Sequence, residues 1–491
     1  MNAQIHATLE PDGILLAVID MPGKTMNVFS VELMDALDAL MDRVERDPFV
    51  QSVVLTSGKP SFLAGADLVM VRGYTDAAST ASPEAMFEMC GRLGRQFVRL
   101  EASAKPWVAA VNGIALGGGM ELALACRSRL VTSDSRAQLG LPEVRWGLLP
   151  GAGGTQRLPR LAGFEVAADM LLSGRSITPL DAVRLGLFAR AVPPDRLLDE
   201  ARGVALSLHG KAYDAAAKFP HLMQSDVPAY SASAVRAIAA RNGVSDQDFA
   251  DYPAYSAIID SVLKGARLPM ADATAVEMRQ FLRLMFNPVA GNMVGTLFLE
   301  RLRAERELAA PPNVRIGSIG VGAISAGRNA WADDLIKLRL AQEKDAKLPA
   351  DTLELIDQNG ARHRISLRVL ADAPEAADAI PCAILAPSGP YGRVLEVVAA
   401  RGTTVPAASA FAALLRCLPW HTPGPVSVLQ SLRGQSSERQ HQLARAYAAQ
   451  PDAGDPAFMD VAACLAGVTP AWSGGPFASL TPSIRKGDSP C

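Results

Sequence analysis

The chain has 491 residues, of which 49% are hydrophobic and 20% are charged, as expected of a globular protein with roughly three domains of about 150 residues each. Its 48 basic and 50 acidic side chains leave a formal net charge of −2, which gives no sign of a nucleic-acid partner or of an anionic membrane surface. The sequence shows no secretion signal, no apolar run of about 18 residues that could insert into a membrane, and no cysteines at metal-ligand spacing. We therefore expect a cytoplasmic protein without membrane insertion and without a metal site.

The first part of the chain alternates strand and helix signals up to about residue 190. Short apolar runs bounded by turn residues over 13–21, 50–58 and 106–113 predict strands. Between these runs, apolar side chains recur at helical spacing over 33–44 and 86–100, which predicts amphipathic helices. This order of elements predicts an α/β layer architecture.

In the remainder of the chain, the pattern of predicted secondary structure changes twice. Helix signals with few strand signals come first, as in AVEMRQFLRLMF. The segment APPNVR is typical of a linker, and RIGSIGVGAISAG then predicts a strand that enters a glycine-rich turn and a helix. Beyond about residue 445 the chain is rich in proline, glycine and serine, and we predict it to be irregular. The predicted parts of the chain are 1–195, 196–310, 311–445 and 446–491.

Two loops rich in glycine and small residues each precede a predicted helix start. A strand ends at Asn112, before ALGGGMEL, and a helix begins within that segment at Gly118 or Gly119; SFLAGADLVM, over 61–70, has the same character. The unpaired amides of a helix's first turn point outward, and the helix dipole adds positive potential there. Glycine also lets the backbone approach a ligand closely, so such amides suit a developing oxyanion. Either loop alone is also compatible with an ordinary tight turn.

Two carboxylates accompany these loops. Glu121 opens an apolar helix, and Glu143 lies between apolar residues and glycine turns in LGLPEVRWGLLPGAGG. A glutamate at a helix N-terminus often only stabilises the helix dipole, and a loop glutamate is usually solvated. Apolar surroundings would instead raise the pKa of both carboxyls by desolvation. Paired carboxylates of this kind suit acid–base work on a water molecule and a carbon acid.

The segments SFLAGADL, AAVNGIALGGGMELALAC and LGLPEVRWGLLPGAGGTQRLPRLAG resemble the enoyl-CoA hydratase/isomerase (crotonase) superfamily. They are most similar to the N-terminal part of the multifunctional α-subunit of fatty-acid β-oxidation, and the similarity covers residues 10–195. The resemblance implies a crotonase-type ββα superhelix, followed by the helical segment of those subunits and a degenerate Rossmann-like α/β domain.

By this resemblance, the N–H groups of Ala66 and Gly118 form an oxyanion hole for the thioester oxygen. Glu121 activates a water molecule and Glu143 gives a proton to the α-carbon, so that a trans-2-enoyl-CoA becomes a 3-hydroxyacyl-CoA without any cofactor. A double-bond isomerase side activity, which needs only the acid at Glu143, is also implied. The further substrate-binding residues that it implies are Ala64, Gly65, Asp67, Gly117 and Trp146, the last of which replaces an aliphatic residue and narrows the acyl pocket.

The segment after the linker resembles the NAD-dependent 3-hydroxyacyl-CoA dehydrogenase part of the same subunits. Gly320 and Gly322 match the nucleotide-binding glycines, but Ser325 stands in the third glycine position. A dinucleotide site has an acidic residue at the end of a strand about 20 residues after the glycine segment. We find none at the end of a clear strand there, because Asp357 comes later in the chain. The segment WHTPGPVSVLQSLRGQSS is similar to a shortened catalytic segment with His421 as the histidine, and an ordinary surface histidine is the competing interpretation.

Gln430 matches the position of that histidine's acidic partner, and a neutral amide cannot stabilise an imidazolium as a carboxylate does. We therefore predict a hydratase with an inactive dehydrogenase half that does not use NAD. Two alternatives stay open: a bifunctional hydratase and dehydrogenase, or an acyl-CoA-binding or assembly subunit of a β-oxidation complex. The expected partners are an acyl-CoA substrate and either a thiolase or a second copy of the chain.

Overall fold

The protein is described here by a computed structural model that forms two compact units, 1–291 and 292–491. Each unit is described by itself. The structure describes residues 4–221, 232–308, 314–320, 344–345, 352–369, 382–385, 394–398, 409–410, 412, 417–422, 427–449, 455–466, 468 and 475. Within these ranges, no helix is long and apolar enough to cross a membrane.

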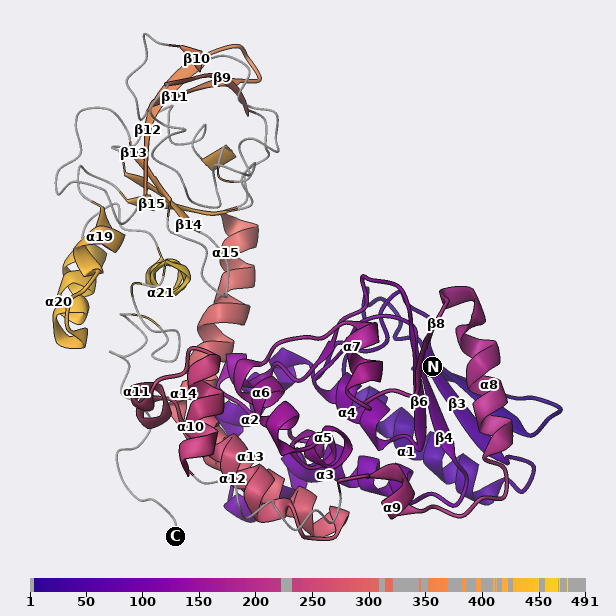
Figure 1. Ribbon diagram of the computed structural model, residues 1–491. Helices are drawn as coiled ribbons and strands as arrows, with labels where there is room; N and C mark the ends of the chain where they lie inside the picture. The colour runs from indigo at the N-terminus through magenta and orange to yellow at the C-terminus, as the bar shows by residue number, and fades with distance from the viewer. Residues whose placement is uncertain are drawn as a thin grey trace. The chain divides into compact units, whose positions relative to one another are not determined.

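The first unit is built on a six-stranded sheet with the order β1-β2-β3-β4-β6-β8 (Figure 1). β1 runs antiparallel to β2, and all other neighbours are parallel. Two short strands, β5 and β7, pair in parallel beside it. The strands are β1 (Ile5–Leu9), β2 (Ile14–Ile19), β3 (Ser52–Ser57), β4 (Trp107–Val111), β5 (Ala115–Leu116), β6 (Ser128–Thr132), β7 (Leu139–Gly140) and β8 (Arg190–Val192).

Helices follow the strands as the hydrophobic periodicity predicts. In α1 the Ser30 hydroxyl caps the N-terminus by accepting from Leu33 N, and the apolar stripe from Leu33 to Val44 is buried. The predicted strands over 13–21, 50–58 and 106–113 and both predicted helices are confirmed, whereas β1 was not predicted. The helices that begin before residue 195 are α1 (Val31–Arg46), α2 (Leu68–Ala77), α3 (Pro83–Ala102), α4 (Gly118–Ala125), η1 (Glu143–Trp146), α5 (Gly154–Ala162), α6 (Phe164–Ser173), α7 (Pro179–Arg184) and η2 (Pro194–Arg196).

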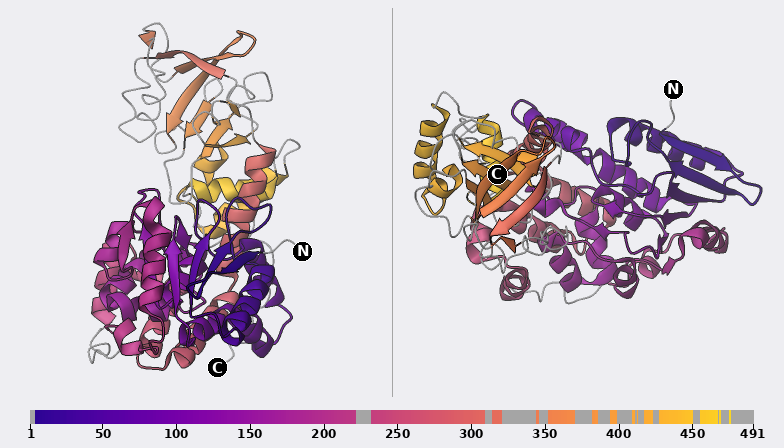
Figure 2. Two further views of the ribbon diagram at one scale, coloured as in Figure 1. Left: turned by 90° about the vertical axis from the view of Figure 1, so that its right-hand side faces the viewer. Right: turned by 90° about the horizontal axis from the view of Figure 1, so that it is seen from above.

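The predicted helical region after residue 195 begins within the first unit. α8 packs its apolar face on β3, β4 and β6 of the sheet. Figure 2 shows the ribbon from two further sides. Farther along, α13 packs against α12 and α3 and also contacts α5, the helix that follows the segment of Glu143. The helices are α8 (Leu197–Ser207), α9 (Ala215–Lys218), α10 (Ala232–Arg241), α11 (Asp246–Asp251), α12 (Pro253–Gly265), α13 (Met270–Met285) and α14 (Pro288–Val294).

The second unit contains a seven-stranded sheet with the order β10-β9-β11-β12-β13-β14-β15. Three of its six strand pairings, β9–β11, β11–β12 and β13–β14, are antiparallel. A doubly wound nucleotide-binding sheet is mostly parallel, so these strands differ from the predicted Rossmann-like pattern. The elements are η4 (Gly295–Glu300), α15 (Arg301–Glu307), β9 (Val314–Gly320), β10 (Lys344–Asp345), β11 (Thr352–Asp357), β12 (Arg362–Val369), β13 (Cys382–Leu385), β14 (Val394–Val398), β15 (Leu418–Thr422), α19 (Val428–Leu432), α20 (Ser437–Ala448) and α21 (Pro456–Leu465).

The antiparallel pairing of β11 with β12 has a local cause. Only four residues, 358–361, separate the two strands, and Gly360 adopts a φ of +84°. A connection this short can join only antiparallel strands, since a parallel pair needs a crossover of a dozen residues or more. The Asn359-Gly360 pair between two apolar runs is a strong hairpin signal that our sequence analysis did not use.

The tail that we predicted to be irregular contains a buried helix, α21. Asp455 caps its N-terminus by accepting from Ala457 N at 2.8 Å, and Pro456 occupies the first helical position, where it needs no N–H partner. The apolar side chains from Phe458 to Leu465 belong to the core of the second unit. Pro456, one of the residues that suggested an irregular tail, therefore marks the start of a helix.

Candidate active site

The two glycine-bearing loops predicted to form an oxyanion hole lie side by side in the first unit. Leu116 N donates to Leu63 O at 3.1 Å, and Leu63 and Ala115 form a parallel bridge. Gly65 has a φ of +91°, and a Cβ built on it would lie 3.3 Å from Leu116 O and 3.9 Å from the N atom of Gly118. The prediction that a helix begins at Gly118 or Gly119 is confirmed, and α4 starts at Gly118.

Each outer glycine of the GGG triplet is required by a close contact. Gly117 has a φ of +53°, and a Cβ on it would lie 2.8 Å from Glu143 Oε1. Gly119 lies inside α4, where a Cβ would lie 2.2 Å from Leu63 O. Because Gly117 has no Cβ, the Glu143 carboxylate can lie beside the turn. Because Gly119 has none, α4 can pack against the loop that contains Leu63. Glycines that should weaken a helix are therefore needed for approach of the backbone.

The backbone N–H groups of Ala66 and Gly118 donate no hydrogen bond to any atom in the described ranges. Phe29 N donates to Gly65 O at 2.8 Å and Asp67 N to Phe29 O at 3.0 Å, which holds the Ala66 loop in an extended conformation. Gly118 is the first residue of α4, so its N–H is one of the helix's orphan donors. Two unused donors thus lie on adjacent loops.

Replacing Gly119 with alanine is expected to destabilise the first unit by about 1–3 kcal/mol, because the new methyl group would overlap Leu63 O and push the two loops apart. Thermal unfolding and activity measurements check this prediction. The matched control is Gly203→Ala in α8, which meets no atom within 4 Å and should leave stability equal or raised by up to about 1 kcal/mol. Equal melting temperatures for the two variants would contradict the close approach.

Glu121 lies in the first turn of α4 and is 2% exposed. Its Oε1 accepts hydrogen bonds from the N atoms of Ala152 and Gly154, both at 2.7 Å, whereas Oε2 accepts none in the described ranges. Burial raises the pKa of Glu121 to about 7, although the two amide donors and the charge of Arg157 act in the opposite direction. Oε1 of Glu121 is therefore fixed by two hydrogen bonds, and Oε2 is available to accept a hydrogen bond from a bound molecule.

Glu143 begins the short helix η1, and its Oε2 is buried without a hydrogen-bond partner in the described ranges. The turn is held by Leu148 N, which donates to Glu143 O at 3.1 Å, and by Tyr252, whose hydroxyl donates to Val144 O. Burial, followed by the charges of Glu121 and Glu277, raises the pKa of Glu143 well above its ordinary value. Two N–H donors stabilise the charged form of Glu121, whereas the Oε2 atom of Glu143 has no such donor in the described ranges, so Glu143 is the member of the pair whose surroundings favour the protonated form.

Sequence reasoning assigned no role to Glu277, a third buried carboxylate. Its side chain on α13 is 0% exposed and accepts from Gly153 N at 2.5 Å and Thr155 N at 2.9 Å. A signal was present, because Glu277 stands four residues after buried Ala273 and so falls on the apolar face of the helix.

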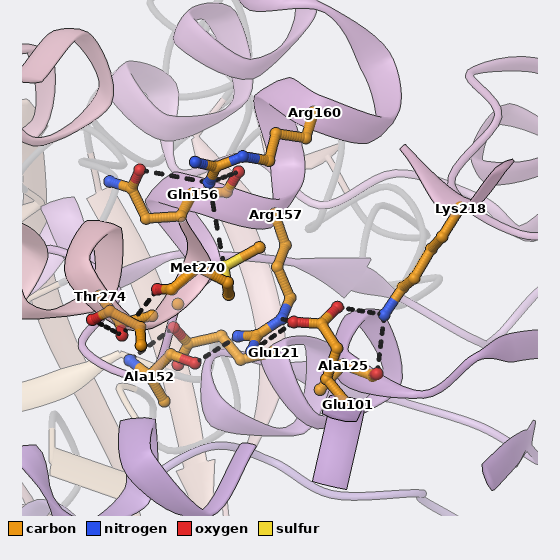
Figure 3. Close-up of polar contacts among 12 residues, drawn as sticks. Glu101, Glu121, Ala125, Ala152, Gln156, Arg157, Arg160, Lys218, Met270 and Thr274 are labelled. Carbon is orange, nitrogen blue, oxygen red and sulfur yellow. Dashed lines mark hydrogen bonds and ion pairs between the residues drawn. The ribbon is translucent and has the colours of Figure 1, made fainter. Parts of the chain in front are cut away.

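A buried ion network holds Ala152, whose N–H group binds Glu121 (Figure 3). Arg157 donates to Ala152 O at 2.8 Å and to Glu101 Oε2 at 3.1 Å, and its side chain is fully buried. Lys218 binds the other oxygen of Glu101 and donates to Ala125 O, the last residue of α4, at 2.7 Å. Burial lowers the pKa of Lys218 to about 7, against the opposing effect of Glu101.

Asn27 is a second residue that sequence reasoning missed. It is fully buried, and its side chain joins the ends of β2 and β3 to the loop that carries Ala66. Nδ2 donates to Ile19 O, Ser57 Oγ and Phe62 O, Oδ1 accepts from Met21 N, and the backbone oxygen of Asn27 accepts from Ala64 N.

The remaining predicted residues of the first unit lie around the same loops. Asp67 caps α2 by accepting from Val69 N at 2.9 Å, which is a structural use of its carboxylate. Trp146 is the last residue of η1 and is partly buried. Ala64, Gly65 and Gly117 form the loops described above. Within the described ranges, no group of His, Cys, Asp and Glu side chains could hold a metal ion.

The second unit carries the predicted nucleotide-binding residues only in part. Gly320 ends β9, but Gly322 and Ser325 lie outside the described residues. Asp357 pairs with Val314, at the opposite end of β9 from Gly320, so it cannot be the acid of a dinucleotide site.

The second unit brings an acidic residue next to Gly320. Asp345 ends β10, which runs parallel to β9, and pairs with Gly320. An acidic residue therefore ends the neighbouring strand, 20 residues after Ser325. A strand of only two residues has no hydrophobic pattern from which the sequence could predict it. His421 lies on β15 and Gln430 on α19.

Comparison with known proteins gives matches to one family. The family model for enoyl-CoA hydratase/isomerase matches residues 11–251. The fatty acid oxidation complex subunit alpha of Shewanella halifaxensis is 38% identical over 302 residues, which cover 61% of this chain and 41% of that protein. The corresponding subunit of Shewanella baltica is 34% identical over 332 residues, 67% of this chain and 46% of that protein.

The matched part of the chain thus spans less than half the length of these relatives. A crystal structure of an enoyl-CoA hydratase from Bacillus anthracis is 25% identical, has a TM-score of 0.38, and covers 62% of this chain and 96% of that one. The family match and the identity to the two subunits, together with the sheet, helices and loops of the first unit, lead to one conclusion. This chain carries a domain of the enoyl-CoA hydratase/isomerase (crotonase) superfamily with the α/β crotonase fold.

Proposed function

We propose that the chain adds water to trans-2-enoyl-CoA thioesters to give 3-hydroxyacyl-CoA, as a step of fatty-acid β-oxidation in the cytoplasm. One observation carries the proposal: the buried Glu121, which accepts two N–H hydrogen bonds, and the half-buried Glu143, whose Oε2 has no hydrogen-bond partner in the described ranges, lie beside two unused backbone N–H donors. Groups whose environments separate their pKa values are natural partners as base and acid. Here Glu121 is the base and Glu143 is the acid.

The reaction follows from this arrangement. Glu121 takes a proton from a water molecule through its available oxygen, and the water oxygen forms a bond to Cβ of the substrate. The electron pair of the Cα–Cβ double bond moves toward the thioester oxygen, which accepts hydrogen bonds from the N–H groups of Ala66 and Gly118. Glu143 then gives its proton to Cα, so one water molecule has been added and no oxidant or cofactor is consumed.

The proposal is tested with the purified full chain and trans-2-enoyl-CoA substrates of short and long chain length. Hydration removes the conjugated double bond, so the absorbance of the conjugated thioester should fall. The chain-length series also tests whether Trp146 narrows the acyl pocket, in which case short substrates react faster. An unchanged absorbance with every chain length would refute the proposal.

The specificity constant kcat/KM is expected to follow a bell-shaped dependence on pH, because it reports the ionisation of the free enzyme. The active form has Glu121 ionised and Glu143 protonated. Because the pKa of Glu121 is raised to about 7, activity should rise as the pH increases through about 7, and it should fall at higher pH when Glu143 loses its proton. A pH profile of kcat/KM checks this, and a profile that is flat across neutral pH would contradict the assignment.

A nucleotide-binding role is the second candidate for the second unit, favoured by the pairing of Asp345 with Gly320. We expect no dehydrogenation of 3-hydroxyacyl-CoA, because Ser325 replaces a glycine and Gln430 replaces the acidic partner of His421. Titration with NAD tests nucleotide binding, and formation of NADH from a 3-hydroxyacyl-CoA would show that the dehydrogenase step has been retained.

We further propose a thiolase or a second copy of this chain as the protein partner, since the relatives named above are subunits of a fatty acid oxidation complex. Light scattering of the purified chain, alone and mixed with a thiolase, separates self-association from assembly with the thiolase. A mass of one chain in both samples would contradict both partners. The alternative of an acyl-CoA-binding or assembly subunit predicts thioester binding without turnover.

A further inference from the structure

The turn that leads from η1 into the first residues of α5, residues 152–155, is held in an unusual way. Its four successive backbone N–H groups are accepted alternately by two carboxylates from distant elements. Glu121 on α4 takes the first and the third, and Glu277 on α13 takes the second and the fourth, those of Gly153 and Thr155. No side chain of the turn itself caps α5, because Gly153 is the N-cap residue.

Both carboxylates suit this position, since N–H donors at a helix N-terminus and the helix dipole stabilise negative charge. Their proximity also couples them. Burial and then the charge of Glu121 raise the pKa of Glu277 to about 8, while the hydroxyl of Thr155 and the two N–H donors act in the opposite direction. The charged groups that face Glu277 are Glu121 on α4, Glu143 on η1 and Arg160 on α5.

We propose that Glu277 is a positioning residue for the hydration reaction: by accepting the Gly153 and Thr155 N–H groups it fixes the turn that binds one oxygen of Glu121, so that the other oxygen stays directed at water. This inference rests on the proposed hydratase function. Glu277 lies beyond residues 11–251, which the family model matches, so the positioning comes from the helical region that follows.

The charge of Glu277 has a second consequence for the acid. Negative charge on Glu277 raises the pKa of Glu143, after burial and the charge of Glu121. Removing that charge makes the proton of Glu143 easier to lose. Glu277 therefore acts on the base through hydrogen bonds to the turn, and on the acid through its charge at pH values above its raised pKa of about 8, where the basic limb of the profile lies.

The test is Glu277→Gln in the full chain. Its amide keeps one accepting oxygen but lacks the charge and the second acceptor, so kcat should fall at least about tenfold while KM stays unchanged, because Glu277 touches neither the CoA nor the acyl chain in this scheme. The basic limb of the kcat/KM profile should also move to lower pH. Glu277→Asp keeps the charge with a shorter reach, so its kcat should fall while the basic limb stays near its wild-type position.

Ser261→Ala is the matched control. Ser261 is equally buried and contacts Thr155 Oγ1 at 2.7 Å, but it binds none of the four N–H groups. It should lower the melting temperature without changing kcat or moving the basic limb. A Glu277→Gln variant with wild-type kcat, or with a fall in kcat that leaves the basic limb in place, would overturn the proposal.

Two other outcomes are also decisive. If Glu277→Gln does not fold, the aspartate variant decides the question, and a wild-type kcat in that variant would overturn the proposal. If the wild-type chain hydrates no enoyl-CoA, the proposed function fails. If the wild type is active and the Glu277 variants behave like the serine control, the positioning role alone fails.

Discussion

Replacing Glu143 with glutamine should lower kcat for enoyl-CoA hydration by about 10²- to 10⁴-fold, the usual contribution of a positioned acid or base. The amide has nearly the shape of the carboxylic acid but cannot give a proton to Cα. The melting temperature should change little, because the buried Oε2 atom has no hydrogen-bond partner in the described ranges to lose. Steady-state rates and thermal unfolding of both proteins check the two statements.

The corresponding Glu121→Gln variant serves as the comparison. It should lose hydration to a similar extent, because the amide cannot take a proton from water. Double-bond isomerisation of a 3-enoyl-CoA, which the family resemblance assigns to the acid at Glu143 alone, should survive in this variant and be lost in Glu143→Gln. The reverse pattern would mean that the roles of the two acids are exchanged.

The largest effect on stability is expected for Glu101→Gln. This change leaves the buried cations Arg157 and Lys218 without their shared anion, and breaking such a buried pair costs about 3–5 kcal/mol. Arg157 also holds Ala152 O, so hydration should weaken as well. Chemical denaturation followed by circular dichroism measures the loss.

An exposed ion pair provides the control for that experiment. Asp260 pairs with Lys264 and Arg283 while more than a third of each side chain is exposed, so Asp260→Asn should cost about 1 kcal/mol or less. Similar free energies of unfolding for the two variants would contradict the importance of burial at Glu101.

The local parts of the site could be predicted from the sequence. The start of α4 at Gly118, the helices α1 and α3, and the central strands follow from apolar periodicity and turn residues that are close together in the chain. The two acids stand among apolar residues in motifs that resemble a known family. Their assignment as base and acid stays a prediction, and the different hydrogen bonding of their carboxyl oxygens supports it.

The long-range parts could not be predicted in the same way. Glu277 meets Thr155 across 122 positions of the chain, and nothing local distinguishes it from a solvated helical glutamate except its place on the apolar face. Asn27 likewise joins segments that only the folded sheet brings together. In the second unit, composition misled us at α21, and the Asn359-Gly360 hairpin and the short strand β10 were overlooked.

The central claim is that the paired carboxylates add water to an enoyl thioester. Its most direct test is the mass of the product when the full chain is incubated with a short trans-2-enoyl-CoA in ¹⁸O-labelled water. The wild type should give a 3-hydroxyacyl-CoA that carries one ¹⁸O atom, and a variant with both Glu121→Gln and Glu143→Gln should give no more product than buffer. Unchanged thioester from the wild type, or equal product from the double variant, would contradict the claim.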